Sequence, residues 1–193
     1  METLQAIRTR QSVAKVCDRR PTRAEVTALL EAAVRAPNHH LTEPWRFLVL
    51  TGRALEDLGE AMAEGARRQH AGDHDLEMRV QVERARPRRA PVIVAVVYVP
   101  SHHPRALEVE DRYAVGAAVE NLLLAAHATG LAAHLRTGAA AQDPTVREYL
   151  GLEDGEEVAT FVYLGYPGGE PRPFSRRTPA GERTEWRGWD PAP

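Results

Sequence analysis

Three short polar stretches combine residue types that can bind an anionic, planar ligand with positions where a helix or strand is expected to end. They are Arg10-Gln11-Ser12, residues 35–39, and Leu135-Arg136-Thr137-Gly138. An arginine can hold a phosphate through two hydrogen bonds, a serine hydroxyl can bond to a phosphate or sugar oxygen, and free backbone amides can bond to ring nitrogens and carbonyls. The residues alone leave an alternative open, in which Arg10 and Arg35 are solvated and Ser12 is a turn residue.

The other reactive residue types form no recognisable catalytic or metal-binding pattern. The adjacent pairs His39-His40 and His102-His103 would point to opposite sides of an extended chain, and no H-E-x-x-H motif is present. None of the serines lies in G-x-S-x-G, and Lys15, the only lysine, has no P-loop context. We therefore expect no metal site and no catalytic side-chain dyad.

The composition gives no reason to expect a nucleic-acid or membrane partner. The 193 residues are 43% hydrophobic and 27% charged, with a formal net charge of −2. The basic run at residues 84–89 has no interleaved aromatic residues, which favours a solvated loop. A single cysteine, Cys17, and an N-terminus without a signal-peptide pattern favour a cytoplasmic protein.

The longest apolar stretch, residues 111–129, predicts a helix of about 28 Å that ends before Gly130. Its clearly polar residues are only Glu120, Asn121, His127 and Thr129. A helix that is apolar nearly all round is buried, and one domain of this size rarely surrounds such a helix completely. We therefore expect part of it to contact a second copy of the chain. The alternative is an ordinary core helix in a monomer.

Further helices are expected at residues 3–10, 22–36, 53–69 and 144–150, with partial helix around 76–82. Thr22 and Glu25 have the spacing of a capping box. Strands are expected at residues 46–50, 91–99, 132–135 and 158–164. The interleaved order predicts a single layered domain of α+β or α/β type over residues 1–193. Its tail, from about residue 167 to 193, is too rich in Pro, Gly and Arg to form a core, although Trp186 and Trp189 favour packing over another surface.

The order of several motifs resembles the nitroreductase family of flavoproteins, particularly its compact NAD(P)H nitroreductase branch, over roughly residues 4–166. Arg10-x-Ser12 resembles the opening R-x-S motif, and Arg35-Ala36-Pro37 with Pro44-Trp45 resembles the later A-P-S and Q-P-W signature. Residues 116–131, GAAVENLLLAAHATGL, resemble the central dimer helix and are the most specific match. Thr137-Gly138 and the Leu164-Gly165 strand end complete the series.

This resemblance implies a three-layer α+β sandwich, in which helices flank a central, mainly antiparallel sheet and a long central helix lies at a dimer interface. It also implies FMN bound between the subunits of a homodimer. NAD(P)H would be the co-substrate, passing hydride to flavin N5. A small-molecule electron acceptor, such as a nitroaromatic or a quinone, would then be reduced in a ping-pong sequence.

The resemblance also assigns roles to residues by position. Arg10, Gln11 and Ser12 would hold the phosphate and ribityl oxygens of FMN, and Arg35 and His39 would reach the same FMN from the partner subunit. Leu135, Arg136 and Thr137 would lie along the flavin, with an amide near Thr137-Gly138 donating to N5. Arg177, in an R-x-P motif, would contact the phosphate.

Three positions depart from the family pattern. Ala14 stands where members often have a cation, with Lys15 beside it. Leu41 replaces a frequent asparagine, and Glu43 replaces the usual glutamine. A specialised flavoenzyme of the same fold (a dehalogenase, a dehydrogenase or a flavin-cleaving enzyme) and a non-catalytic flavin-binding protein therefore stay as alternatives.

Overall fold

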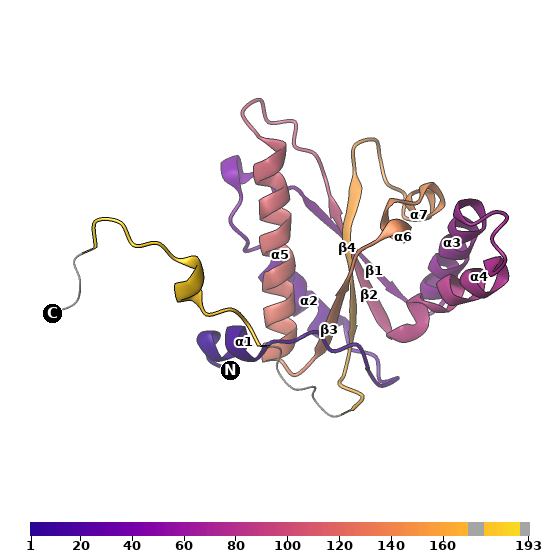
Figure 1. Cartoon of the computed structure of the whole chain (residues 1–193), viewed down its shortest axis with the longest axis horizontal. Coiled ribbons are helices and arrows are strands. Elements are labelled where there is room, and N and C mark those ends of the chain that lie inside the picture. Colours follow the sequence, from indigo (N-terminus) through magenta and orange to yellow (C-terminus); the bar gives the residue numbers. More distant parts are fainter. Residues whose placement is uncertain (170–175, 190–193) are drawn as a thin grey trace.

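The computed structural model describes residues 1–169 and 176–189, and a four-stranded sheet lies at its centre (Figure 1). The strands are β1 (Trp45–Thr51), β2 (Val92–Tyr98), β3 (Ala132–Arg136) and β4 (Glu157–Gly165). They are arranged in the order β1-β2-β4-β3, and every neighbouring pair is antiparallel. All of β2 is buried, as expected for a β-branched run in an inner strand. The predicted antiparallel sheet is confirmed.

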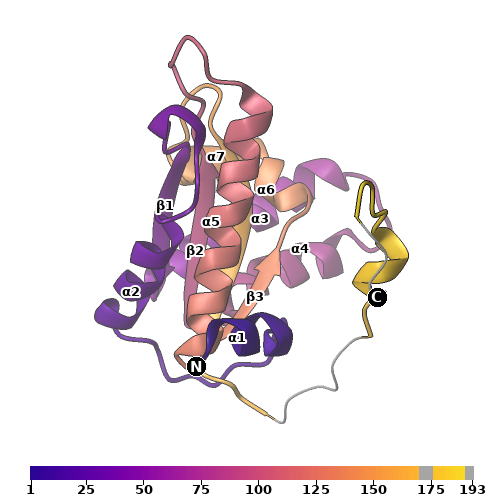
Figure 2. The same ribbon diagram turned by 90° about the vertical axis from the view of Figure 1, so that its left-hand side faces the viewer.

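Two helices cover one face of the sheet, α2 (Arg23–Ala33) and α5 (Glu108–Ala128). Figure 2 shows α5 running across the sheet with α2 beside it. Alternate residues of β2, including Val94 and Val96, pack against Leu29 of α2 and Leu122 of α5. The α2 helix begins with the expected capping box, because Thr22 Oγ1 accepts from the Glu25 amide while the Glu25 carboxylate accepts from the Thr22 amide.

The other face of the sheet is covered by α3 (Arg53–Gln69), α6 (Ala139–Gln142) and α7 (Pro144–Tyr149). Here Ile93 and Phe161 of the sheet pack against Leu58 of α3 and Val146 of α7. A further helix, α4 (Leu76–Ala85), lies against α3 on the outside. Helices on both faces of one sheet make the three-layer α+β sandwich that the sequence predicts.

The N-terminal segment lies beside α5 and the edge strand β3. The first helix, α1 (Thr3–Thr9), lies at the C-terminal end of α5 (Figure 2). The chain then runs beside the edge strand β3, where the Val13 amide donates to the Ala133 carbonyl oxygen at 3.0 Å. Further along, Val16 pairs with Pro167. Residues 10–12 are thereby held between α5 and β3.

Some boundaries differ from the sequence prediction. The long helix begins at Glu108 rather than at residue 111, so three acidic residues belong to its first turn, where they complement the helix dipole. Regular α2 ends at Ala33 instead of 36, and α6 was not expected. A stripe along α5 is also exposed in the single chain: the Tyr113 side chain, for example, is 72% exposed.

Within the tail predicted from about residue 167, residues 176–189 extend away from the rest of the chain (Figure 1). They contain one short 3-10 turn, Ala180–Arg183. Trp186 and Trp189 are exposed and contact each other, with ring centroids 5.2 Å apart. The rest of the predicted tail, residues 170–175 and 190–193, lies outside the described residues. No helix in the described ranges has the length and apolarity needed to cross a bilayer.

Candidate functional site

A cleft of about 380 Å³ lies between α5 and the neighbouring ends of β2, β3 and β4. We call it the α5–β3 cleft. The polar side chains that line it are Tyr98, Arg112, Glu120, Thr137 and Thr160, and Gly116 lines it without a side chain. Its volume is in the usual range for small-molecule sites. The apolar part of its wall consists of Val115, Val119, Leu123, Leu135 and Ala159.

The cleft side of α5 presents three positions spaced by one helical turn each. Glu120, Gly116 and Arg112 are four residues apart, so they lie on one side of the helix over a length of about 12 Å. A Cβ added to Gly116 would meet no other atom within 4 Å. The backbone of α5 is therefore open to a flat ligand at the middle of this row.

The Arg10-Gln11-Ser12 segment lies at the Glu120 end of this row. Arg10 Nε donates to Oε1 of Glu120 at 3.2 Å, and Thr9 Oγ1 lies 2.8 Å from Nε2 of His127 on the next turns of α5. Gln11 is half-buried and Ser12 is exposed, and among the described residues neither side chain has a hydrogen-bond partner. Both are available to a ligand, as is the guanidinium of Arg10 once Glu120 moves aside.

The third polar stretch divides between the two faces of the sheet. Leu135 and Thr137 line the α5–β3 cleft. Arg136 points to the opposite face, because successive side chains of a strand alternate, and its guanidinium lies 5.7 Å from the ring centroid of Tyr163. Gly138, with a φ of 129°, ends the stretch before α6 in a conformation that glycine adopts readily. Of the three predicted side chains, two therefore reach the cleft and Arg136 does not.

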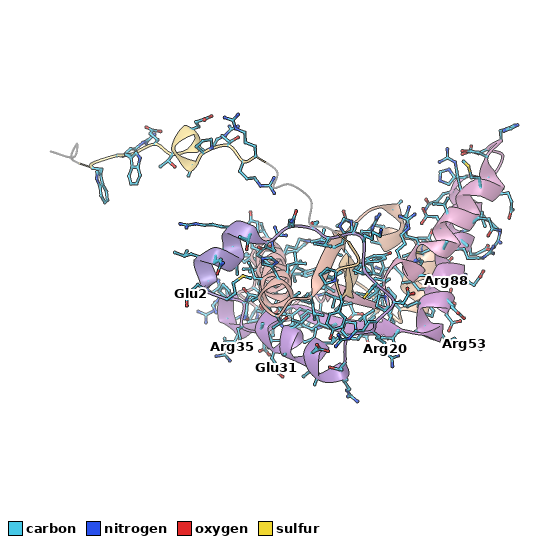
Figure 3. All side chains as sticks on the ribbon, turned by 90° about the horizontal axis from the view of Figure 1, so that it is seen from below. Glu2, Arg20, Glu31, Arg35, Arg53 and Arg88 are labelled. Atoms are coloured by element: carbon cyan, nitrogen blue, oxygen red, sulfur yellow. The ribbon has the colours of Figure 1, made fainter. Side chains whose placement is uncertain are left out.

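Arg35 and His39 do not line the cleft. Arg35 lies on the outer surface beyond the end of α2, near Glu31 (Figure 3). His39 lies at the N-terminal end of α5, where its Nδ1 is 2.8 Å from Oε2 of Glu110. Their predicted contacts with an FMN of the partner subunit stay a prediction.

The loop that carries His39 has an unusual backbone. His40, Leu41 and Glu43 all have positive φ values, between 43° and 55°, which is uncommon for residues other than glycine. The His40 ring is stacked between those of His39 and His103, at centroid distances of 3.8 and 4.5 Å. Burial, followed by the charges of its neighbouring histidines, lowers the pKa of His40 below its usual value.

The residues that depart from the family pattern do not line the α5–β3 cleft. Ala14 is exposed, and Lys15 extends along Gly169, so neither provides a cation to the cleft. The Leu41 side chain is 82% exposed. Glu43 is exposed as well, and its amide donates to the Asn38 side chain at 2.9 Å.

Arg177 is exposed, belongs to the arm of residues 176–189 and is not among the residues that line the cleft. Its predicted contact with a phosphate stays a prediction, because the single chain does not bring it to Arg10.

Sequence reasoning missed Arg112 and Tyr98. Arg112 Nε donates to Glu108 at 2.7 Å, its two terminal nitrogens donate to both carboxylate oxygens of Glu157 at 3.0 and 3.1 Å, and its guanidinium lies 4.5 Å from the Tyr98 ring centroid. Hydrogen bonds from Arg112 are the main reason that the pKa of Glu157 is lowered. The i,i+4 spacing of Glu108 and Arg112 favours an ion pair on a helix. The helix predicted from sequence begins at residue 111, however, and therefore leaves Glu108 out.

In the described part of the chain, no three His, Cys, Asp or Glu residues are grouped so that they could hold a metal ion.

The chain is an α+β sandwich with a cleft beside a long helix. The family model described as "Nitroreductase family" matches residues 7–166. A curated relative, "Putative NAD(P)H nitroreductase YdjA" of Escherichia coli K12, is 30% identical over 167 residues, which cover 86% of this chain and 89% of the relative. The chain belongs to the nitroreductase family.

Two solved structures support the same conclusion. A nitroreductase-like family protein from Bacillus cereus matches with a TM-score of 0.84 and 25% identity, covering 97% of each chain. A nitroreductase-type protein from Desulfovibrio desulfuricans, crystallised in complex with FMN, matches with a TM-score of 0.73 and 28% identity, covering 100% of this chain and 99% of the other.

Proposed function

We propose that this protein is an FMN-dependent oxidoreductase that takes hydride from NAD(P)H and reduces a small electron-poor acceptor, such as a nitroaromatic or a quinone. The family assignment supports the proposal, together with the FMN in the Desulfovibrio desulfuricans structure and the NAD(P)H nitroreductase name of the Escherichia coli relative. The observation that carries it is that Arg10 donates to Glu120, which lines the same cleft as Gly116, Leu135 and Thr137.

The residues present fit FMN. An anionic phosphate needs a cation, which Arg10 provides at one end of the row on α5. A flat ring system needs apolar walls and an open approach, which Leu135 and Gly116 provide. Its polar edges need hydrogen-bonding groups, and Thr137 lines the same cleft. Glu120 is the one feature that opposes a phosphate, so it must leave Arg10 when FMN binds.

The flavin, when bound, supplies the hydride chemistry, and the chain's own residues bind and orient. Arg10 and Ser12 would hold the phosphate end, and Leu135 would exclude water from one side of the ring. The backbone amide near Thr137-Gly138 would donate a hydrogen bond to the ring edge. We assign no acid–base role to a side chain.

We further propose that the active form is a homodimer. The exposed stripe of α5, with Tyr113, would then be covered by the second copy. Arg35 and His39 lie away from the cleft of their own chain, and in a dimer they would complete the cleft of the partner.

The test is anaerobic reduction of the purified protein. We expect a yellow protein whose FMN absorption bleaches on addition of NADPH or NADH and returns on addition of a nitroaromatic or a quinone. Bleaching without recovery would favour a specialised flavoenzyme of the same fold. A flavin-bound protein that neither nucleotide reduces would be a flavin-binding protein, and a colourless protein that does not take up FMN would overturn the proposal.

A further inference from the structure

The α5–β3 cleft contains one cationic side chain among the described residues that line it, and this is Arg112. It stands two helical turns from Glu120, and therefore at the opposite end of the row from Arg10. A ligand that places its phosphate at Arg10 and extends along α5 brings its ring system towards Arg112.

The surroundings of Arg112 fix its position. Glu157 accepts two parallel hydrogen bonds from the guanidinium, Glu108 accepts a third, and the ring of Tyr98 lies against its plane. This geometry holds the guanidinium far more tightly than a solvated arginine is held. The two carboxylates also offset its charge, so removing either one would strengthen the positive field in the cleft.

Two-electron reduction adds negative charge to a flavin ring, and fixed charges beside the ring decide how favourable that change is. The Arg112 side chain is 42% exposed in the free chain, and a bound ring would exclude water from it, so that its charge would act more strongly than in bulk water. Because Ala14 and Lys15 supply no cation to the cleft, and Arg10 lies at the opposite end of the row, Arg112 is the group placed to act beside the ring.

We propose that Arg112 is the residue that tunes the reduction potential of FMN in this protein, and that Glu157 and Glu108 set the strength of its effect. Arg112 would stabilise the reduced flavin, and its two carboxylate partners would limit that stabilisation. This inference rests on the proposed function, because it requires FMN in the cleft.

The experiment is a redox titration of the FMN-loaded protein, followed by absorption. In Arg112→Gln, we expect the ratio of affinities for reduced and oxidised FMN to fall about tenfold, which lowers the midpoint potential by about 30 mV. In Glu157→Gln, we expect the potential to rise, because the carboxylate charge is lost while Arg112 is kept. Glu108→Gln should raise it less, since Glu108 accepts one hydrogen bond rather than two.

Two controls separate this role from a structural one. Arg112→Lys keeps the charge, so its affinity ratio should stay within about threefold of the parent. Arg79→Gln is the matched charge removal: Arg79 also bonds to a carboxylate four residues earlier, Asp75, but it lies on α4 outside the cleft. Its potential should equal that of the parent. Potentials are compared only for variants with parent-like circular dichroism, and Glu157→Gln tests the inference if Arg112→Gln does not fold.

Opposite shifts in Arg112→Gln and Glu157→Gln would support the inference. Shifts in the same direction, or none in either variant while FMN is bound, would overturn it and leave the proposed function intact. A parent protein that does not bind FMN would overturn both.

Discussion

Arg10 and Glu120 are 110 residues apart in sequence, yet Arg10 Nε lies 3.2 Å from Oε1 of Glu120. The pair connects the R-x-S segment to α5 at one end of the α5–β3 cleft. The Arg10 side chain is only 23% exposed, whereas that of Glu120 is 50% exposed and can turn into solvent. An incoming phosphate would therefore replace Glu120 as the partner of Arg10.

Replacing Arg10 by alanine is expected to weaken FMN binding roughly tenfold to a hundredfold. A hydrogen bond to a charged group contributes about 1.5–3 kcal/mol, and about 1.4 kcal/mol is a factor of ten in affinity. Riboflavin has no phosphate, so its affinity should hardly change. Fluorescence titration of flavin-free Arg10→Ala with both ligands measures this, and unchanged FMN affinity would place the phosphate elsewhere.

Glu120→Gln should have the opposite effect on FMN. The amide keeps the size of the side chain but no longer competes with the phosphate for Arg10 as a charge, so FMN should bind more tightly and riboflavin equally well. Weaker FMN binding in this variant would show that Glu120 assists the ligand rather than competing with it.

The exposed stripe of α5 gives a direct test of the proposed homodimer. Tyr113→Glu places a charge on this stripe, and burying an unpaired charge in an interface is costly. We expect the variant to be largely monomeric by light scattering at concentrations where the parent is a dimer. Met78→Glu, on α4, replaces another exposed apolar side chain and should stay dimeric. Leu123 is unsuitable for this test because it is buried in the chain's own core.

Stability should fall as the pH is lowered through the titration range of His40. Its pKa in the folded chain lies below the usual value, first because of burial and then because of His39, His103 and Arg105, with Glu110 acting in the opposite direction. The unfolded chain takes up a proton near pH 6.5, so below that value it binds more protons than the folded chain and unfolding becomes easier.

Denaturant titrations between pH 7.5 and 5.5 measure this dependence. His40→Asn is the informative variant, since asparagine tolerates a positive φ and does not titrate. Its pH slope should be smaller than that of the parent. A residual slope is expected because burial lowers the pKa of His127 too. An equal slope in both proteins would show that His40 does not contribute.

The capping box of α2 is expected to stabilise the fold. Thr22→Ala removes the side-chain cap and should lower the free energy of unfolding by about 1 kcal/mol, within a range of about 0.5–2 kcal/mol. Thr27→Ala is the control, because Thr27 is an exposed threonine inside the same helix. Urea denaturation that shows equal losses for both variants would contradict a specific role for the cap.

The parts of the fold that depend on local signals could be predicted from sequence. Thr22 and Glu25 form the predicted cap, and the β-branched run at β2 forms an inner strand. The start of α5 was misplaced because Glu108, Glu110 and Asp111 look polar in an apolarity count, although they favour a helix N-terminus. The short α6 consists of three alanines and a glutamine, which show no apolar periodicity that would predict a helix.

The candidate site could be predicted only in part. The resemblance selected Leu135 and Thr137, which line the cleft, and strand alternation alone explains why Arg136 does not. The pairing of Arg112 with Glu157, 45 residues away, follows from the packing of α5 against the start of β4 and has no local signal. Arg35, His39 and Arg177 do not line the cleft, and their contacts with FMN stay predictions.

The central claim is that the α5–β3 cleft holds the flavin ring, and Gly116→Leu tests it most directly. A side chain at position 116 meets no other atom of the chain near its Cβ, and leucine favours the helix by nearly 1 kcal/mol over glycine. The flavin-free variant should therefore be at least as stable as the parent. Titration with FMN and with riboflavin is the decisive measurement. We predict that Gly116→Leu loses both ligands, unlike Arg10→Ala, which loses affinity for FMN alone, whereas a folded Gly116→Leu protein that binds FMN as tightly as the parent would contradict the claim.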